Sequence, residues 1–414
     1  MAAPTVGEVL GRGRVRGGLR LLGPGFVAAI AYVDPGNVAT NVSAGARHGY
    51  LLLWVVVVAN LMAVVVQHLS AKLGLVTGRS LPELCRDRYP ARVNRVLWIQ
   101  AELVAIATDL AEFVGAALAI HLLTGAPLLV GAAITGAASF ALLTLRDRGY
   151  RRFERAVAAA LAVILVGFGV ALVAVDVVPA DLVGGLVPRL AGGDALLLAV
   201  GIVGATVMPH VVYLHSALMT DRFRPGDPDE LRALLRFARL DVGLAMLTAG
   251  AVNAAMLVFA AAAFAGVGTP IADLDDAYRV TGLVLGSAAA VGFALALLAS
   301  GLSSSSVGTL AGQVVMAGFI GRRIPLVVRR TVTMAPALAC LAVGLGPTDL
   351  LIVSQVVLSF GIPFVLVPLV ELTASRRLMG EFANPRPLTA LASVIAIVVV
   401  AMNVLLLATT VGVT

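Results

Sequence analysis

The sequence contains little charge and very little cysteine. Only 13% of its 414 residues are charged, whereas 60% are hydrophobic, and the mean hydropathy is +0.99. Its two cysteines, Cys85 and Cys340, are far apart and their spacing suggests neither a disulfide framework nor a metal cage. A soluble core cannot absorb so much apolar surface. The composition therefore predicts a polytopic membrane protein.

Apolar runs long enough to cross a bilayer, which takes about 20 residues, alternate with charged clusters. Backbone polar groups in a bilayer must bond within the chain, so we expect helices and an all-α polytopic fold in one transmembrane domain, 1–414. The run at 280–316 is too long for a single span, and we expect it to project beyond the bilayer. The eleven predicted transmembrane helices lie near 24–46, 50–71, 95–122, 126–145, 156–176, 194–219, 238–266, 280–316, 328–346, 349–371 and 387–410.

Basic residues are distributed unevenly along the chain. If the N-terminal segment 1–23 is cytoplasmic, 27 of the 30 Lys and Arg residues lie in segments on the cytoplasmic side. The positive-inside rule therefore predicts a cytoplasmic N-terminus and an extracytoplasmic C-terminus. Membrane topology then explains the net charge of +7, and we expect no nucleic-acid partner. The preference for Arg, Ala and Val is typical of a GC-rich bacterial genome, so the expected location is the bacterial cytoplasmic (inner) membrane.

Two spans carry residues that interrupt helices. The first contains Asp34-Pro35-Gly36-Asn37, and the sixth contains "GATVMPHVVYLH", residues 204–215. Proline removes a backbone donor and glycine tolerates open backbone, so both spans are expected to unwind near the membrane midplane. A pair of ordinary proline kinks is the alternative interpretation.

The two interrupted spans occupy matching places if the chain contains two five-helix repeats. The first repeat would be 24–176 and the second 194–371, with 387–410 as an added eleventh span. Spans one and six start on opposite sides, so the repeats would be inverted. Interrupted helices at matching positions of inverted repeats indicate the central site of a transporter.

The interrupted segments offer a mixed set of metal ligands. Asp34 supplies a charged oxygen and Asn37 an amide oxygen three residues later. The carbonyl of Ala205 is free to turn inward because Pro209, four residues on, has no N–H. Met208 adds a thioether, which favours softer transition metals over Ca²⁺ or Mg²⁺. Core packing is the alternative role for this methionine.

Other polar residues near the breaks have less defined roles. His210 and His215 could bind metal, but we favour hydrogen-bonding or protonatable roles for both. Gln355 in span ten could supply one more oxygen when the site closes. The serines at 303–306 are typical of close helix packing.

Three acids lie within the third span. Glu102 and Asp109 are seven residues apart and so share nearly one helix face, and Glu112 lies one turn beyond. Such carboxylates cannot face lipid, and they predict either a proton route or structural hydrogen bonds between helices. Arg329 and Arg330 open the ninth span as positive-inside anchors or as counter-charges at the exit of that route.

These motifs resemble the Nramp (natural resistance-associated macrophage protein) family of divalent-metal transporters. The likeness extends from about Gly23 to Leu407, and is greatest to bacterial proton-dependent manganese transporters. Either "DPGN" or "MPH" alone is a weak signal, but both occur in order on the expected spans. The supporting segments are "ATDLAEFVGAA" (107–117), "GATVMPHVVYLHSAL" (204–218), "GTLAGQVVM" (308–316) and "IPLVVRRTVTM" (324–334).

The resemblance implies a LeuT-like fold and proton-coupled uptake of Mn²⁺ and Fe²⁺, often with Cd²⁺ or Co²⁺. The metal is a substrate, so no resident cofactor is expected, and neither is an obligatory protein partner. The implied metal ligands are Asp34, Asn37, the Ala205 carbonyl and Met208, joined in some conformations by the Ala31 carbonyl and Gln355. The implied proton route contains Asp34, Asp109 and Glu112, with His210 nearby and Arg329 and Arg330 toward the cytoplasm. Pro363 and His68 depart from the family pattern.

Rival functions make different use of the same residues. A sodium-coupled symporter of small organic substrates could share the fold, but Asp34 would repel a substrate carboxylate approaching the first break. An intramembrane metalloenzyme would need a motif such as His-Glu-x-x-His, which the sequence lacks. A metal-gated sensor would need a signalling domain, and none is evident.

Overall fold

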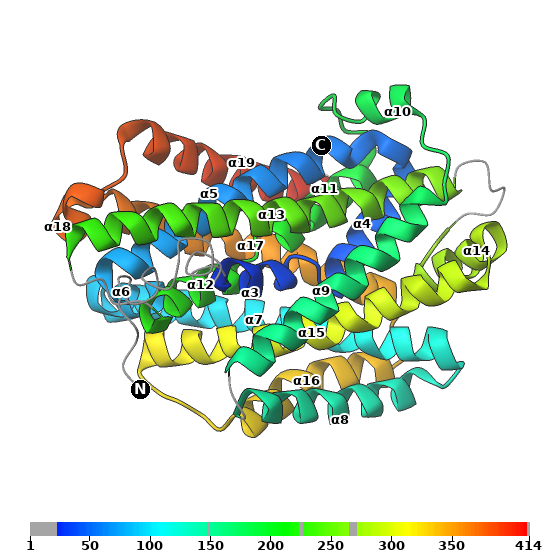
Figure 1. Cartoon of the computed structure of the whole chain (residues 1–414), viewed down its shortest axis with the longest axis horizontal. Coiled ribbons are helices and arrows are strands. Elements are labelled where there is room, and N and C mark those ends of the chain that lie inside the picture. Colours follow the sequence, from blue (N-terminus) through cyan, green and yellow to red (C-terminus); the bar gives the residue numbers. More distant parts are fainter. Residues whose placement is uncertain (1–22, 148–149, 223–226, 265–270, 412–414) are drawn as a thin grey trace, which may run out of the picture.

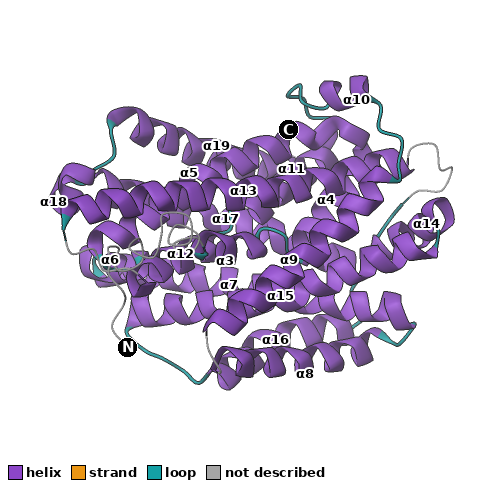
Figure 2. Ribbon diagram, viewed as in Figure 1, coloured by secondary structure: helices purple, strands orange, loops and turns teal. Residues whose placement is uncertain are grey.

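The computed structural model describes residues 23–147, 150–222, 227–264 and 271–411. Every regular element in these ranges is a helix (Figure 2). Apart from Gly23, the predicted cytoplasmic segment 1–23 lies outside the described residues.

The helices follow the predicted spans, with short helices between some of them. In chain order they are α3 (Pro24–Ala31), α4 (Pro35–His48), η1 (Gly49–Leu52), α5 (Leu53–Thr77), α6 (Leu81–Arg88), α7 (Ala91–Thr124), α8 (Leu128–Asp147), α9 (Tyr150–Val173), α10 (Pro179–Gly184), α11 (Gly192–Thr206), α12 (Pro209–Arg222), α13 (Pro228–Phe264), α14 (Leu274–Leu285), α15 (Ser287–Ile320), α16 (Leu326–Ala342), α17 (Pro347–Ala374), α18 (Arg376–Met379), η2 (Gly380–Phe382) and α19 (Arg386–Val411).

Seven described segments are long and apolar enough to cross a membrane, judged by length and composition. One of them, Pro35–Thr77, joins the second half of span one to span two because α4, η1 and α5 follow without a gap. Two shorter apolar helices, Leu128–Ala141 and Ala158–Val173, correspond to spans four and five. Each of the eleven predicted spans thus contains its own helix or pair of helices.

The run 280–316, predicted to be too long for a single span, is divided between two helices. Gly286, with φ of +90°, separates α14 from α15, and this backbone conformation suits glycine. Asp273 caps the start of α14 by accepting a hydrogen bond from the Asp276 N–H at 2.8 Å. The run is therefore a short helix followed by a separate long helix, a division that hydropathy alone does not reveal.

Helix α3 lies near the centre of the bundle, between α13 and α15 (Figure 1). Its first turn is fixed by Asp241 of α13, which accepts hydrogen bonds from the N–H groups of Gly23 at 3.1 Å and Gly25 at 2.7 Å. These N–H groups have no partner within the helix, so the carboxylate satisfies donors that would otherwise be unpaired. The first half of span one is therefore anchored to the second repeat.

The residues that follow α3 leave the helix but keep their hydrogen bonds. Asn253 of α13 donates to the carbonyl of Tyr32 at 2.9 Å, and Ser300 of α15 donates to the carbonyl of Val33 at 2.6 Å. Hydrocarbon offers no alternative partner for such carbonyls. Side chains from spans seven and eight thus stabilise the interruption of span one.

Helix α17 continues through Pro363 with help from the last helix. Pro363 has no N–H, so the carbonyl of Ser359 lacks its usual partner four residues on. Asn403 of α19 donates from Nδ2 to that carbonyl at 3.0 Å, and the Ser359 hydroxyl donates to Asn403 Oδ1 at 2.8 Å. Pro363 therefore does not end the tenth span.

Close packing of α4 on α13 depends on Gly45. A methyl group there would overlap the Leu257 carbonyl and approach Ala260 Cβ to 2.8 Å. We expect Gly45→Ala to lower the free energy of unfolding by about 1–3 kcal/mol through overpacking, seen as a lower thermal midpoint of the detergent-purified protein. Gly243→Ala in α13 is the matched control, because a methyl there meets open space. Equal midpoints for the two variants would contradict this packing.

Candidate functional site in the two helix breaks

The interruptions of spans one and six come together inside the bundle. Asn37, near the start of α4, donates from Nδ2 to Asp34 Oδ1 at 2.8 Å and to the carbonyl oxygen of Ala205 at 2.9 Å. All three residues are fully buried. A carboxylate and an amide from the first repeat thus share a polar contact with a backbone carbonyl of the second.

The first break is shorter than predicted. It covers Tyr32 to Asp34, and Pro35 already begins α4, so the expectation that Asn37 lies in unwound chain is wrong. Asp34 is the N-cap, and its Oδ1 accepts the Asn37 N–H at 2.8 Å. Proline is favoured at the first helical position because its missing N–H would be unpaired there anyway. The same residues that stop α3 therefore start α4.

A proline also begins the second half of span six. Only Val207 and Met208 separate α11 from α12, which starts at Pro209. The carbonyls of Ala31 and Ala205 each lie four residues before a proline, so neither can accept the usual helical hydrogen bond from that residue. Each break thus presents a carbonyl freed in the same way. Met208 is fully buried between the two helix halves.

Gln355 of α17 reaches the same place. Its Nε2 lies 3.5 Å from Asp34 Oδ2 and donates to the Ser354 hydroxyl at 3.2 Å. Gly36 and Gly204 make room for it, because a β-carbon at Gly36 would overlap the Gln355 amide and one at Gly204 would overlap the Gln355 carbonyl. The two breaks and α17 therefore pack at the distance that only glycine permits.

The site contains more oxygen acceptors than donors. Asn37 Oδ1 and Gln355 Oε1 are buried, with no hydrogen-bond partner among the residues that the structure describes. The Asn37 amide nitrogen lies between the Asp34 and Ala205 oxygens, and turning the amide over would direct its oxygen to the same point. Carboxylate, amide and carbonyl oxygens around one point suit a cation, and Met208 from the second break could add sulfur.

Two ion pairs, one buried and one partly buried, connect α16 to the acids of α7. Arg329 Nη2 lies 2.9 Å from Glu102 Oε2, and Arg330 Nη1 lies 3.4 Å from Asp109 Oδ1. Both arginine side chains are almost fully buried. Of the two interpretations of these arginines, the ion pairs favour counter-charges, since both side chains turn into the bundle to pair with α7.

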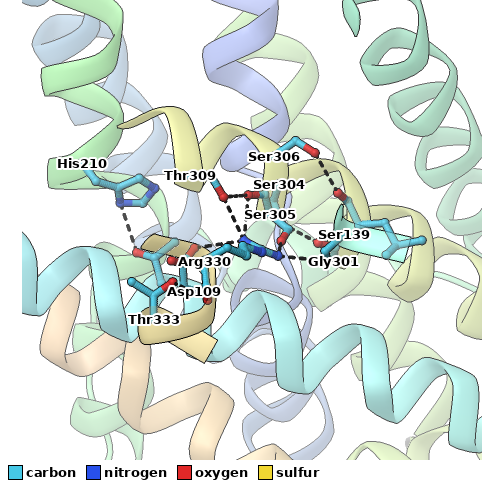
Figure 3. A network of polar contacts seen from close by, with 12 residues as sticks. Asp109, Ser139, His210, Gly301, Ser304, Ser305, Ser306, Thr309, Arg330 and Thr333 are labelled. Atoms are coloured by element: carbon cyan, nitrogen blue, oxygen red, sulfur yellow. Dashed lines mark hydrogen bonds and ion pairs between the residues drawn. The ribbon is translucent and has the colours of Figure 1, made fainter. Parts of the chain in front are cut away.

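Arg330 is held by hydroxyl and carbonyl groups from two helices, α8 and α15 (Figure 3). Its guanidinium donates to the Ser305 carbonyl at 3.1 Å, Thr309 Oγ1 at 2.9 Å and Ser139 Oγ at 3.0 Å, and also contacts the Ser305 hydroxyl. Sequence reasoning missed Ser139 and Thr309, and it assigned Ser305 only to helix packing. The sequence offered one signal for such partners: Arg330 has no acidic residue close to it in the chain. A buried guanidinium has five donors and needs several acceptors, which must then come from other helices.

The third acid of α7 differs from the other two. Glu112 is 1% exposed, and neither of its carboxylate oxygens has a hydrogen-bond partner among the described residues. Glu102 and Asp109 thus face arginines, whereas Glu112 lies one turn beyond Asp109 without a counter-charge of its own.

The histidines of α12 bond to different neighbours. His210 Nδ1 lies 3.2 Å from the hydroxyl of Thr108, the residue before Asp109. His215 Nδ1 lies 2.6 Å from Gln67 Oε1, and the Gln67 amide contacts the Tyr32 hydroxyl at the first break. The structure therefore brings His210 toward the acids of α7 and connects His215 through Gln67 to the first break.

Discontinuous helices that meet at a buried polar site, within an all-α membrane bundle, are typical of transporters. The fold is shared with Mhp1, a nucleobase-cation-symport-1 family transporter, which has a TM-score of 0.61 at 19% identity and covers 86% of this chain and 79% of its own. A manganese transporter from Eremococcus coleocola has a TM-score of 0.86 at 32% identity, covering 95% of this chain and 87% of its own. The LeuT-like, all-α fold class predicted from the sequence is confirmed.

Sequence comparison identifies the family. A family model described as natural resistance-associated macrophage protein-like matches residues 25–409, and the chain belongs to this Nramp family. The "Divalent metal cation transporter MntH" of Deinococcus radiodurans is 52% identical over 403 residues, covering 97% of this chain and 92% of its own length. The MntH of Mycobacterium tuberculosis (strain H37Rv) is 54% identical over 393 residues, covering 94% and 92%. The protein is therefore a transporter and not an enzyme.

The Asp109–Arg330 pair offers a test of the buried network. Asp109→Ala would leave the Arg330 guanidinium buried without its carboxylate, and we expect the free energy of unfolding to fall by about 3–5 kcal/mol. The double variant Asp109→Ala/Arg330→Met removes both charges and should recover most of that loss. Unfolding by denaturant in detergent measures both. A double variant less stable than Asp109→Ala would contradict the ion pair.

Proposed function

We propose that this protein is a proton-coupled secondary transporter that imports divalent transition-metal ions by alternating access. Mn²⁺ and Fe²⁺ are the proposed substrates, with Cd²⁺ and Co²⁺ as related ions. The observation that carries the proposal is the meeting of the two breaks, where Asn37 Nδ2 lies 2.8 Å from Asp34 Oδ1 and 2.9 Å from the Ala205 carbonyl. The names of the relatives, a divalent metal cation transporter and a manganese transporter, support the choice of substrate.

The proposed ligands explain selection for transition metals. Asp34, Asn37 and the Ala205 carbonyl provide oxygen, and a cation at their centre would take the place of the Asn37 donor. Met208 provides sulfur, which binds Mn²⁺, Fe²⁺ and softer ions but adds little for Ca²⁺. Gln355 and the Ala31 carbonyl complete the shell in some conformations. A site with one carboxylate and neutral ligands can release its ion more easily than an all-His/Cys cage, as transport requires.

Movement of the helix halves would expose the site to each side in turn. The halves α3 and α4 meet at Tyr32 to Asp34, and α11 and α12 meet at Val207 and Met208. Backbone without helical hydrogen bonds can bend there while the helices remain rigid. We propose that the bundle containing spans one and six rocks about these points. With the N-terminus cytoplasmic, as the positive-inside rule predicts, protons that enter the bacterial cytoplasm would drive this movement in the direction of import.

Metal binding would be linked to proton movement through Asp34. A carboxylate binds metal in its ionised form, so binding displaces any proton it carries. Glu112, buried and without a partner, is the nearest proposed acceptor along α7, followed by Asp109. Arg330 and Arg329 would favour the ionised forms of Asp109 and Glu102 toward the cytoplasm. His210 and His215 line the proposed route through Thr108 and Gln67.

Uptake by the purified protein in liposomes tests this proposal directly. Mn²⁺ entering the vesicles should acidify their interior, because metal and protons move in the same direction. For the same reason, an interior that is already more acidic than the outside should slow uptake. Asp34→Asn should abolish uptake, since it removes the only carboxylate of the ligand set. Uptake that requires Na⁺ and leaves the internal pH unchanged would instead support the sodium-coupled alternative.

Met208 tests the origin of selectivity. We expect Met208→Ala to retain some Mn²⁺ transport but to lose discrimination against Ca²⁺, because the remaining ligands are oxygens that suit both ions. Competition of Ca²⁺ with Mn²⁺ uptake measures this. The neighbouring Val207→Ala variant controls for the loss of side-chain volume in the break. If Met208→Ala keeps the original selectivity, the sulfur is not a ligand.

A further inference from the structure

A close approach of α15 to the acids of α7 occurs at Gly308. A β-carbon on Gly308 would lie 2.8 Å from Glu112 Oε2, 3.1 Å from Glu112 Oε1 and 3.2 Å from Asp109 Oδ1. Oxygens of both carboxylates therefore border the space beside one glycine Cα. Any other residue at this position would place carbon between or against them.

The Glu112 carboxylate is aimed into this space without a hydrogen bond. It is 1% exposed, and neither oxygen has a partner among the described residues. Burying a carboxylate without donors is costly. A proton, held by the carboxyl group itself or supplied by its neighbour Asp109, would offset that cost.

Other glycines of α15 face α7 or α16 in different ways. A β-carbon at Gly301 would meet the Glu112 carbonyl and Ala116 Cβ, each at 2.9 Å, which are groups of ordinary helix packing. A β-carbon at Gly312 would overlap the Arg329 guanidinium. Gly308 and Gly312, one turn apart, thus leave room for charged side-chain ends, whereas Gly301 only lets two helices approach.

We propose that Gly308 is a positioning residue of the proton route, an inference that rests on the proposed function. The missing side chain keeps Asp109 and Glu112 in one shared space, so that a proton leaving one carboxylic acid is taken up by the other carboxylate, directly or through one water. The O–H bond that breaks on one group is replaced by an O–H bond on the other. A methyl at Gly308 would push the carboxylates apart and exclude the water.

The test is the number of protons that enter liposomes with each Mn²⁺ ion. We expect Gly308→Ala to lower this ratio about tenfold or more, the effect of about 1.4 kcal/mol on the proton-transfer barrier. Binding of Mn²⁺ to the detergent-purified variant should stay near wild type, because the metal ligands are unchanged. A merely structural role would lower binding and coupling together.

Two further glycines of α15 provide matched controls. Gly292→Ala puts a methyl into open space on the same helix and should leave the ratio unchanged. Gly301→Ala creates a tight contact with α7 that involves no carboxylate. A loss of coupling in Gly301→Ala as large as in Gly308→Ala would assign the effect to helix packing and overturn the inference.

Gly308→Ser keeps the experiment decisive if the alanine variant does not fold. Its hydroxyl can donate to the carboxylates, so we expect a smaller fall in the ratio than for alanine. A wild-type ratio in whichever of the two variants folds would overturn the role of Gly308 and leave the proposed function standing. If the wild-type protein itself moves no protons with Mn²⁺, the proposed function fails and the inference fails with it.

Discussion

The structure depends on one constraint: backbone polar groups freed inside an apolar bundle must find partners within the protein. Spans one and six are both opened by a proline, and each opening frees a carbonyl four residues earlier. Asn37 donates to the freed carbonyl of Ala205, Asn253 and Ser300 donate to the carbonyls of the first break itself, and Asp34 caps the helix that follows. The features that make the breaks tolerable therefore also gather carboxylate, amide and carbonyl oxygens at one point.

Charged side chains inside the bundle must likewise find partners within the protein. The arginines of α16 face the first two acids of α7, and hydroxyls from α8 and α15 complete the shell around Arg330 (Figure 3). Glu112, the third acid, has no such partners, and it lies nearest to the glycine of α15 that leaves both carboxylates room. Helix α7 thus carries two acids that are paired with arginine and a third, Glu112, that is not.

Much of this arrangement was predictable because it follows local rules. Hydropathy located the spans, and Pro35 and Pro209 marked both breaks, since proline cannot continue a helix. Contacts between distant segments were not predictable from one sequence: the pairing of Arg329 with Glu102 and the hydroxyl of Ser139 on Arg330 depend on how helices pack. The break at Gly286 was missed because it changes the backbone without changing the hydropathy.

The hydrogen bonds between Asn403 and Ser359 give the eleventh helix a part in the folding of the second repeat. Without α19, the carbonyl that Pro363 frees would face hydrocarbon from the middle of the tenth span. A chain shortened to its ten repeat helices would therefore leave this carbonyl without its donor. The last helix thus stabilises the helix before it at the position where proline interrupts the backbone hydrogen bonds.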